Sequence, residues 1–422
     1  MRHALTSADP SWVLREDGFD TMRESGVESR FAVSNGFLGV RASRAASRGP
    51  TWACYAGGFA WTSWPRTYVA GLFDMPNAEP AVPALVPAAD WLRVRILLDG
   101  EPLLMRTGTL LSHGRTLDMR RGLLISEWRH RSPSGVGVTL RSLRLASQAD
   151  RALGLQLIRL ELDRGDVDVC LEASFEAAGV GLDTVSLGPD LGVWRTLESG
   201  KCLAMAGASG LRIGWEDIAA VQAAPLTWSW EWRSSPGETV EFNRLAAVAR
   251  GDGGRADGGR SDPGGDARGA IARASRIGWR GVLGAHEAAW AERWRCSDIT
   301  VDGDPAAQQA LRFAAYHLNS AANPDDGPVS VGARALTGDS YLGHVFYPVL
   351  WSATGHRRCA VAPRGHHLAS RLAQSRPQPW SPGSRSPADL RRQTREPRTH
   401  DRAGRPCVTL AWPWRAHRQG GR

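Results

Sequence analysis

The stretch from Ser330 to Phe346 is the densest group of residues that could support chemistry. It combines glycines and small polar residues with a cluster of aromatic side chains and a histidine near its end. Glycine lets a backbone approach a ligand closely, and loops carry binding and catalytic residues more often than regular elements do. We therefore predict a loop that holds an exposed site. The residue types alone leave its chemistry open.

Tryptophan is abundant, with 18 residues in the chain. Trp228, Trp230 and Trp232 alternate along one predicted strand, so their indole rings share one face. Flat indole faces can bind sugars, but inward-facing aromatic residues also bury large areas in the core of a sheet. We favour the core for this triplet. Tyr316 and His317 lie on a predicted helix and are likewise expected to pack rather than to bind a ligand.

Other candidate motifs indicate little. The chain contains no phosphate-loop motif, dinucleotide-binding glycine pattern or paired-histidine zinc helix. His366 and His367 lack nearby partner ligands, so we expect a solvated surface and no metal site. The basic cluster Arg391–Arg395 has no interleaved aromatic residues, which favours nonspecific contact over recognition of nucleic acid.

The formal net charge of +9 is distributed unevenly. Residues 347–422 hold fifteen arginines against Asp389, Glu396 and Asp401, whereas residues 1–346 hold 37 basic and 40 acidic side chains. The body of the chain is therefore mildly acidic, and its terminal segment alone makes the chain basic. This distribution argues against a specific nucleic-acid partner.

Six scattered cysteines form no close pair, which is typical of free thiols in a reducing compartment. No apolar run is long enough to span a membrane, and the first residues lack the apolar core of a signal peptide. We therefore expect a cytoplasmic protein without a membrane partner.

The elements that must position these residues change along the chain. Residues 11–250 contain many short runs that alternate between apolar and polar residues, such as 91–97, 136–143 and 155–162, and turn signals such as Asp99-Gly100 separate them. This pattern predicts an antiparallel β-sandwich with one buried and one wet face on each sheet.

Helical periodicity follows the strands. Residues 251–270 are rich in glycine and charge, which predicts a linker or long loop. We expect a helical linker over 271–303, and the helix-start signal Asp304-Pro305 opens a further region, 304–346. Residues 347–422 hold nine prolines and no sustained period, so we predict a disordered tail. The predicted fold class is mixed, β and then α.

Four segments along the chain resemble glycoside hydrolase family 65. They are Arg23-Glu24-Ser25 with Glu28–Arg41, Thr67–Asp74, Leu117–Gly122, and the loop 330–346, which is similar to the segment before the family's sugar-binding Phe-Trp-Asp motif. The resemblance covers about residues 11–346. Ser34 replaces a glycine that the family favours, and Arg334-Ala335 replaces lysine-glycine.

The resemblance implies a fold and a chemistry. The family fold is an N-terminal antiparallel β-sandwich, a helical linker and an (α/α)6 barrel, of which this chain would hold only the start. The implied reaction is inverting cleavage of an α-linked glucose disaccharide such as maltose, trehalose or kojibiose. A glutamic acid protonates the glycosidic oxygen while inorganic phosphate or water attacks. Family resemblance also implies a possible homodimer, and it implies no cofactor.

The resemblance ends between Phe346 and Tyr347. The family's catalytic glutamate and phosphate-binding residues lie further on and match no position here, so no catalytic residue is assigned. His344 and Phe346 are identified as remnants at the edge of the family's substrate-binding site. The abrupt end and the local rise of arginine, proline and histidine favour a frameshifted tail over an evolved one.

Two functions therefore stay open. The chain is expected to be an inactive fragment of an enzyme of this lineage. A general acid needs a water-poor pocket that raises its pKa, and the arginine- and proline-rich surroundings of Asp389, Glu396 and Asp401 offer none. The alternative is a noncatalytic carbohydrate-binding or interaction module made of the β-sandwich. In either case we expect the helix face formed by Ala307, Leu311, Ala315 and Leu318 to lack cover and to leave an apolar patch.

Overall fold

The structure is a computed structural model. It describes residues 6–20, 22–43, 67–75, 82–104, 107–177, 181–252, 262–326, 329–338 and 340–345. The chain divides into two compact units, residues 1–364 and 365–422. All described residues belong to the first unit, so the predicted tail 347–422 lies outside the described residues, as do His366, His367 and the Arg391–Arg395 cluster.

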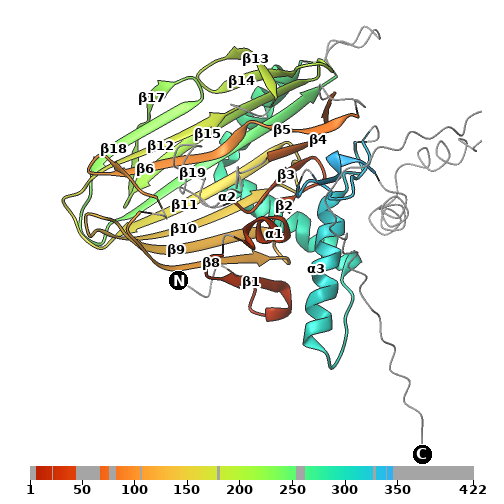
Figure 1. The fold of residues 1–422 in the computed structure, drawn as a ribbon, viewed down its shortest axis with the longest axis horizontal. Helices are drawn as coiled ribbons and strands as arrows, with labels where there is room; N and C mark the ends of the chain where they lie inside the picture. The colour runs from red at the N-terminus through yellow and green to blue at the C-terminus, as the bar shows by residue number, and fades with distance from the viewer. Residues whose placement is uncertain are drawn as a thin grey trace, which may run out of the picture. The chain divides into compact units, whose positions relative to one another are not determined.

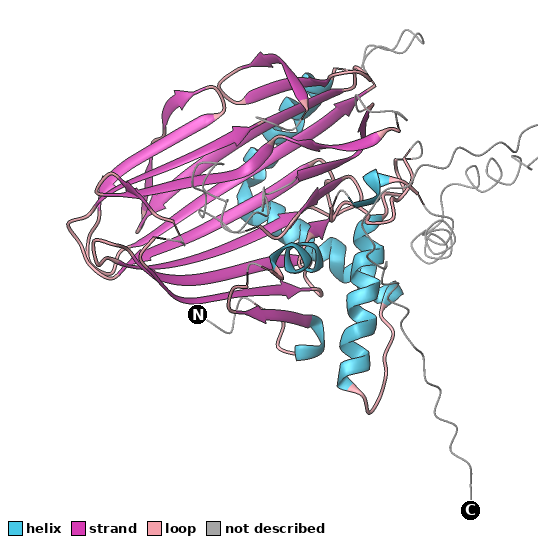
Figure 2. Cartoon of the chain, viewed as in Figure 1, coloured by secondary structure: helices cyan, strands magenta, loops and turns pink. Residues whose placement is uncertain are grey.

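Strands account for most of the regular secondary structure in the described part of the first unit (Figure 1, Figure 2). The large sheet runs in the order β1-β8-β9-β10-β11-β19-β15-β14-β13, with β16 paired to β15. Its strands are β1 (Val13–Asp17), β8 (Thr109–Asp118), β9 (Leu123–Arg131), β10 (Gly137–Ala146), β11 (Leu153–Leu162), β13 (Leu182–Leu187), β14 (Leu191–Thr196), β15 (Cys202–Ile213), β16 (Glu216–Ile218) and β19 (Thr239–Gly251). The pairings in this sheet are antiparallel.

Two smaller antiparallel sheets cover the inner face of the large sheet. The five-stranded sheet has the order β17-β18-β12-β6-β7 and the four-stranded sheet the order β2-β3-β4-β5. Their strands are β2 (Val33–Ser34), β3 (Leu38–Val40), β4 (Thr67–Asp74), β5 (Ala84–Ala88), β6 (Asp90–Leu98), β7 (Glu101–Pro102), β12 (Asp168–Glu176), β17 (Val221–Ala224) and β18 (Thr227–Arg233). The predicted N-terminal β-sandwich is confirmed.

The interior of the sandwich is apolar because alternate residues of each strand face inward. Leu140 and Leu160 of the large sheet share one core with Trp91 and Ile96 of β6. A fully buried Arg244 also links the sheets, because its guanidinium donates hydrogen bonds to the carbonyls of Trp91 and Ser174. Burial lowers the pKa of Arg244 to about 9.

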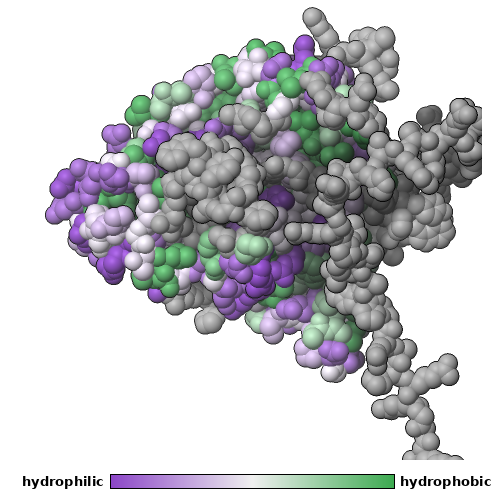
Figure 3. Space-filling model, viewed as in Figure 1, coloured by the Kyte–Doolittle hydropathy of each residue, from purple (hydrophilic) through white to green (hydrophobic). Residues whose placement is uncertain are grey.

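Hydrophilic and hydrophobic side chains are interspersed over the visible described surface in Figure 3. Such a mixture is ordinary for a folded protein, because apolar atoms contribute a large share of its solvent-accessible surface.

The helical part begins earlier than the sequence predicts. Helix α2 spans Pro263–Ser297 and starts inside the predicted linker 251–270, while β19 extends to Gly251. Asp262 caps the helix by accepting a hydrogen bond from the Gly265 N–H. Ala267 and Ala270 are buried against the large sheet, so tertiary packing overrides the low helix propensity of the neighbouring glycines.

The remaining helices are short or lie near the end of the described chain. They are α1 (Glu24–Arg30), α3 (Pro305–Ala321) and the 3-10 turns η1 (Pro10–Trp12) and η3 (Ser340–Gly343). Asp304 caps α3 by accepting hydrogen bonds from the N–H groups of Ala306 and Ala307, as its sequence signal indicates. In the described part of the chain, no helix is long and apolar enough to cross a membrane.

The other domain boundaries that the sequence predicts, such as the one between residues 303 and 304, stay predictions.

Candidate functional site

The loop that follows α3 is seated on the four-stranded sheet. Leu336 is buried in a small cluster with Tyr68 and Leu85, and Val329 packs against that cluster. The His344 ring Nε2 donates a hydrogen bond to the carbonyl of Pro83 at 2.6 Å. The predicted loop is therefore held at two points, Leu336 and His344, and His344 lies at the edge of β5.

Three glycines allow the loop and the end of α3 to pack this closely. A Cβ on Gly39 would lie 2.2 Å from Leu336 Cβ, and one on Gly332 would lie 2.6 Å from the carbonyl oxygen of Gly343. Gly36, at φ +82°, lies so close to Ala322 that a Cβ would meet its backbone at 2.3 Å. These positions require glycine because two backbones meet there.

The C-terminal end of α3 is fixed by donors from three elements. The Ser34 hydroxyl donates to the Ser320 carbonyl at 3.0 Å, and Arg293 of α2 donates to the Asn319 carbonyl at 3.0 Å. Arg151 donates to the Ala322 carbonyl at 3.2 Å. These bonds satisfy carbonyls that a helix end leaves without partners, and the positive charge complements the helix dipole.

The electrostatics of this end are unusual for a surface turn. Burial, together with the nearby charge of Arg293, lowers the pKa of Arg151 to about 10, while Asp325 opposes that shift. Arg250 forms an ion pair with Asp326 at 3.1 Å. The sandwich and the loop are thus joined by half-buried charges as well as by the apolar contact of Leu336.

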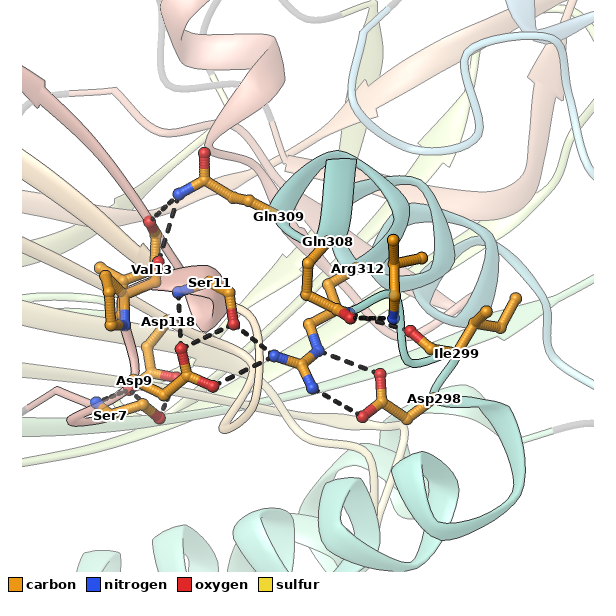
Figure 4. A network of polar contacts seen from close by, with 12 residues as sticks. Ser7, Asp9, Ser11, Val13, Asp118, Asp298, Ile299, Gln308, Gln309 and Arg312 are labelled. Atoms are coloured by element: carbon orange, nitrogen blue, oxygen red, sulfur yellow. Dashed lines mark hydrogen bonds and ion pairs between the residues drawn. The ribbon is translucent and has the colours of Figure 1, made fainter. Parts of the chain in front are cut away.

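The N-terminal half of α3 is held by a second polar network (Figure 4). Arg312 makes a two-bond contact to the Asp298 carboxylate at 3.0 and 2.9 Å, and it also binds Asp9 at 3.2 Å and the Ser11 hydroxyl. The Gln309 amide donates to the carbonyls of Pro10 and Val13. The two networks fix α3 at both ends.

Aromatic rings fill the space between these networks. Trp290 of α2 stacks on Tyr316 of α3 at 5.1 Å and on Trp294 at 5.7 Å. A Cβ on Gly122 would lie 1.9 Å from the Trp290 Nε1, and the Trp294 indole donates to the Met119 carbonyl. The segment Leu117–Gly122, which resembles the family, is therefore the corner on which α2 packs.

The predicted site residues have different outcomes. His344 lies in the seated loop, whereas Phe346 lies outside the described residues, so the role of both in substrate binding stays a prediction. Trp228 and Trp230 are buried core residues and Trp232 packs against the core, as we favoured. Tyr316 is fully buried and His317 bonds the Arg30 carbonyl, so both pack. Among the described residues, no group of three or more metal-ligating side chains forms a metal site.

The exposed face of α3 is apolar, as the sequence predicts in large part. Leu311 and Leu318 are 38% and 40% exposed, and Ala314 is exposed between them. Ala315 is the exception, because it is buried against the aromatic stack. Sequence reasoning missed that Arg151, Arg250 and Arg293 hold the loop. No local pattern marks them as a set, since Arg151 follows Asp150 and Arg293 follows Glu292.

A groove of about 740 Å³ lies on the outer face of the large sheet, beside α2. Strands β8, β9, β10, β11 and β19 form its floor, and Trp279 and Leu283 of α2 form one side. The groove was not predicted, because its residues come from segments far apart in the sequence.

Comparisons with known proteins place this fold. The sequence profile of the glycosyl hydrolase family 65 N-terminal domain matches residues 14–293. A kojibiose phosphorylase of Halothermothrix orenii is 26% identical over 357 residues, which is 80% of this chain and 44% of the relative. An uncharacterized glycosyl hydrolase of Mycobacterium tuberculosis is 27% identical over 364 residues, with the same shares.

A solved structure agrees. A protein from the human microbiome named for kojibiose phosphorylase aligns with a TM-score of 0.67 at 18% identity, over 80% of this chain and 45% of that protein. The common fold is shown by this likeness. The chain spans less than half the length of these relatives. Because the profile matches well over half of its residues, the chain belongs to glycosyl hydrolase family 65.

Proposed function

We propose that this chain supplies the sandwich and the first helices of a protein that cleaves α-glucosidic disaccharides such as kojibiose, maltose or trehalose. The observation that carries the proposal is the family match, together with curated relatives named kojibiose phosphorylase. The attacking group would be inorganic phosphate or water, with inversion at the anomeric carbon. Location in the cytoplasm and assembly as a homodimer stay predictions.

We further propose that the chain as printed has no turnover. A general acid needs a raised pKa. In four described carboxyl groups the pKa is shifted, and in each of them it is lowered. Hydrogen bonds lower the pKa of Asp9, Asp217 and Glu292. Burial acts to raise the pKa of Asp74, but backbone N–H groups that include Ser199 and Glu198 outweigh it. These four groups are suited to structural anchoring rather than to proton donation.

An activity assay tests both statements. The purified chain is incubated with kojibiose, maltose or trehalose, with and without inorganic phosphate, and released glucose and glucose 1-phosphate are measured. We expect no product above the blank. Turnover by this chain that a single substitution within it abolishes would contradict the second statement. A gene that continues in the family's frame after Phe346 should encode a protein with turnover. If that complete protein were inactive on every α-glucoside, the proposed cleavage of α-glucosidic disaccharides would be contradicted.

A second function is a noncatalytic carbohydrate-binding module. The groove on the large sheet favours it, because pockets of 300–1,000 Å³ that combine apolar walls with a few polar groups are typical of ligand sites. Binding of a sugar without turnover is the property that separates this module from the enzyme.

A further inference from the structure

We propose that the groove on the outer face of the large sheet binds a neutral, extended oligosaccharide. This inference deepens the binding-module function above and rests on it. The groove lies on the sheet, apart from the loop that carries His344, and the family assignment attaches no role to it.

A row of charged side chains crosses five strands of the groove floor, from β9 to β15. Residues that pair directly across antiparallel strands share one face of the sheet. The strand registers place the following residues in one such row: Glu127, Arg141, Arg159, Glu241 and Arg212. With strands about 4.8 Å apart, this row is about 19 Å long. It is long enough for several sugar rings in line.

An apolar row of side chains lies beside the charged row. Two residues further along the strands, Ile125, Leu143 and Leu157 pair across β9, β10 and β11. Trp279 and Leu283 of α2 border this row and are only partly buried. The groove is therefore amphipathic across its width, with a charged side and an apolar side.

The position of Trp279 depends on a kink in α2. Gly278 has φ 68° and ψ 169°, which interrupts the helix immediately before Trp279. This conformation strongly favours glycine. The Arg280 guanidinium lies 4.4 Å from the centre of the Trp279 ring, a cation–π contact that favours this ring position. The kink thus allows the chain to place an aromatic ring at the side of the groove.

Four of the five arginines that line the groove form an ion pair with a carboxylate, and one of the four is Arg121, which pairs with Glu287. Arg141 contacts Glu127 at 2.9 Å, Arg159 contacts Glu161 at 2.8 Å, and Arg212 contacts Asp217 at 2.8 Å. A site for phosphate or for an anionic polymer would present a surplus of positive charge. Here each of these guanidinium groups faces a carboxylate, so the groove favours a ligand without net charge.

An oligosaccharide fits both sides of the groove. Its hydroxyl groups both donate and accept, and planar guanidinium and carboxylate groups can each engage two of them. The C–H faces of its rings match the apolar row and the indole. A peptide that adds a strand would need a free sheet edge, whereas this groove lies on the face of paired strands.

Binding of maltoheptaose and of cellohexaose to the full chain, measured by titration calorimetry, tests the proposal. We expect saturable binding of at least one of them. Trp279→Ala and Arg159→Gln should each weaken it by about tenfold, equivalent to about 1.4 kcal/mol. The matched control is Arg233→Gln, which removes an exposed arginine paired with Asp168 on the five-stranded sheet and should leave binding unchanged. Trp279→Phe should retain most of the affinity, and unchanged unfolding midpoints would show that the variants fold.

Three results would overturn the proposal. If the groove variants bind as tightly as the unaltered chain, the sugar binds elsewhere, and the module function survives without this groove. If the unaltered chain binds neither sugar, both the groove and the module function fail, while the lineage is still tested by the activity assay. If sedimentation shows a dimer that Trp279→Ala dissociates, the groove is an interface between copies of the chain.

Discussion

The two helices that pack on the sandwich do so in opposite ways. Helix α2 buries Ala270, Ile271 and Ala274 against the large sheet, as an amphipathic helix on a sheet normally does. Helix α3 turns much of its polar side inward, with Arg312 and Asn319 buried, and leaves Leu311 and Leu318 exposed. Hydrophobic burial therefore places α2, whereas hydrogen bonds and one aromatic stack place α3.

Specific polar contacts therefore set the position of α3. Polar networks specify one position and orientation, because each donor needs a particular acceptor. An apolar face left outside is a surface suited to a further contact, since exposed apolar patches on proteins mark interaction sites. We expect the buried side of α3 to contribute to the free energy of unfolding and the exposed side to contribute almost nothing.

The largest effect is expected from Tyr316→Ala. This substitution removes a fully buried ring that stacks on Trp290 and should lower the free energy of unfolding by about 3–5 kcal/mol through the cavity it leaves. Urea unfolding measures this value. Leu318→Ala, on the exposed face of the same helix, is the control and should change it by less than about 0.5 kcal/mol. Equal effects of the two substitutions would contradict the contrast between the faces.

A buried histidine of α2 should make the stability depend on pH. Burial lowers the pKa of His286 from 6.5 to about 4, although a hydrogen bond to the Arg121 carbonyl opposes this shift. The neutral ring accepts from the Gln148 N–H and donates to that carbonyl. The unfolded chain then binds the proton more tightly, so this stability is present above about pH 6.5 and is lost as the pH falls toward 4. Between pH 7 and pH 5 the loss should be about 2 kcal/mol.

The variant His286→Gln isolates this contribution. A glutamine amide can both accept and donate but does not titrate. Unfolding free energies at pH 7 and pH 5 should differ less in the variant than in the unaltered chain. The same pH dependence in both proteins would mean that another group, such as His130 or His317, whose pKa values are also lowered by burial, accounts for it.

A smaller effect is expected from Arg312→Met. It leaves Asp298 and Asp9 without their guanidinium partner, and half-burial of this network suggests a cost of about 1–2 kcal/mol. Arg295→Met removes an exposed ion pair with Glu292 and should cost almost nothing. Thermal unfolding of both variants makes the comparison. A loss for Arg295→Met as large as that for Arg312→Met would show that the network has no special role.

The smallest effect on stability is expected from replacing Leu311 and Leu318 together by glutamine. Both side chains are exposed, so the free energy of unfolding should change by less than about 0.5 kcal/mol. Binding of a hydrophobic dye should nevertheless fall, because the apolar patch is removed. Unchanged dye binding would place the apolar surface elsewhere on the molecule.

The class of the fold follows from patterns within short segments of the sequence. Alternation at a period of two in segments such as 155–162 predicts strands because one face of each must be buried, and Asp304-Pro305 predicts the start of α3 because the cap is local. The sequence also indicated the family, through segments whose glycines the structure shows in close backbone contact. Local signals of this kind need no knowledge of the rest of the molecule.

How distant segments meet is visible in the tertiary structure and not in the local patterns. Helix α2 begins at Pro263 because Ala267 and Ala270 find the large sheet, which glycine content alone does not reveal. The contacts of Arg151 and Arg293 with the end of α3, and the groove beside Trp279, join residues that lie far apart along the chain. Such contacts depend on strand order and register, and a local pattern specifies neither, because the same alternation fits many pairings.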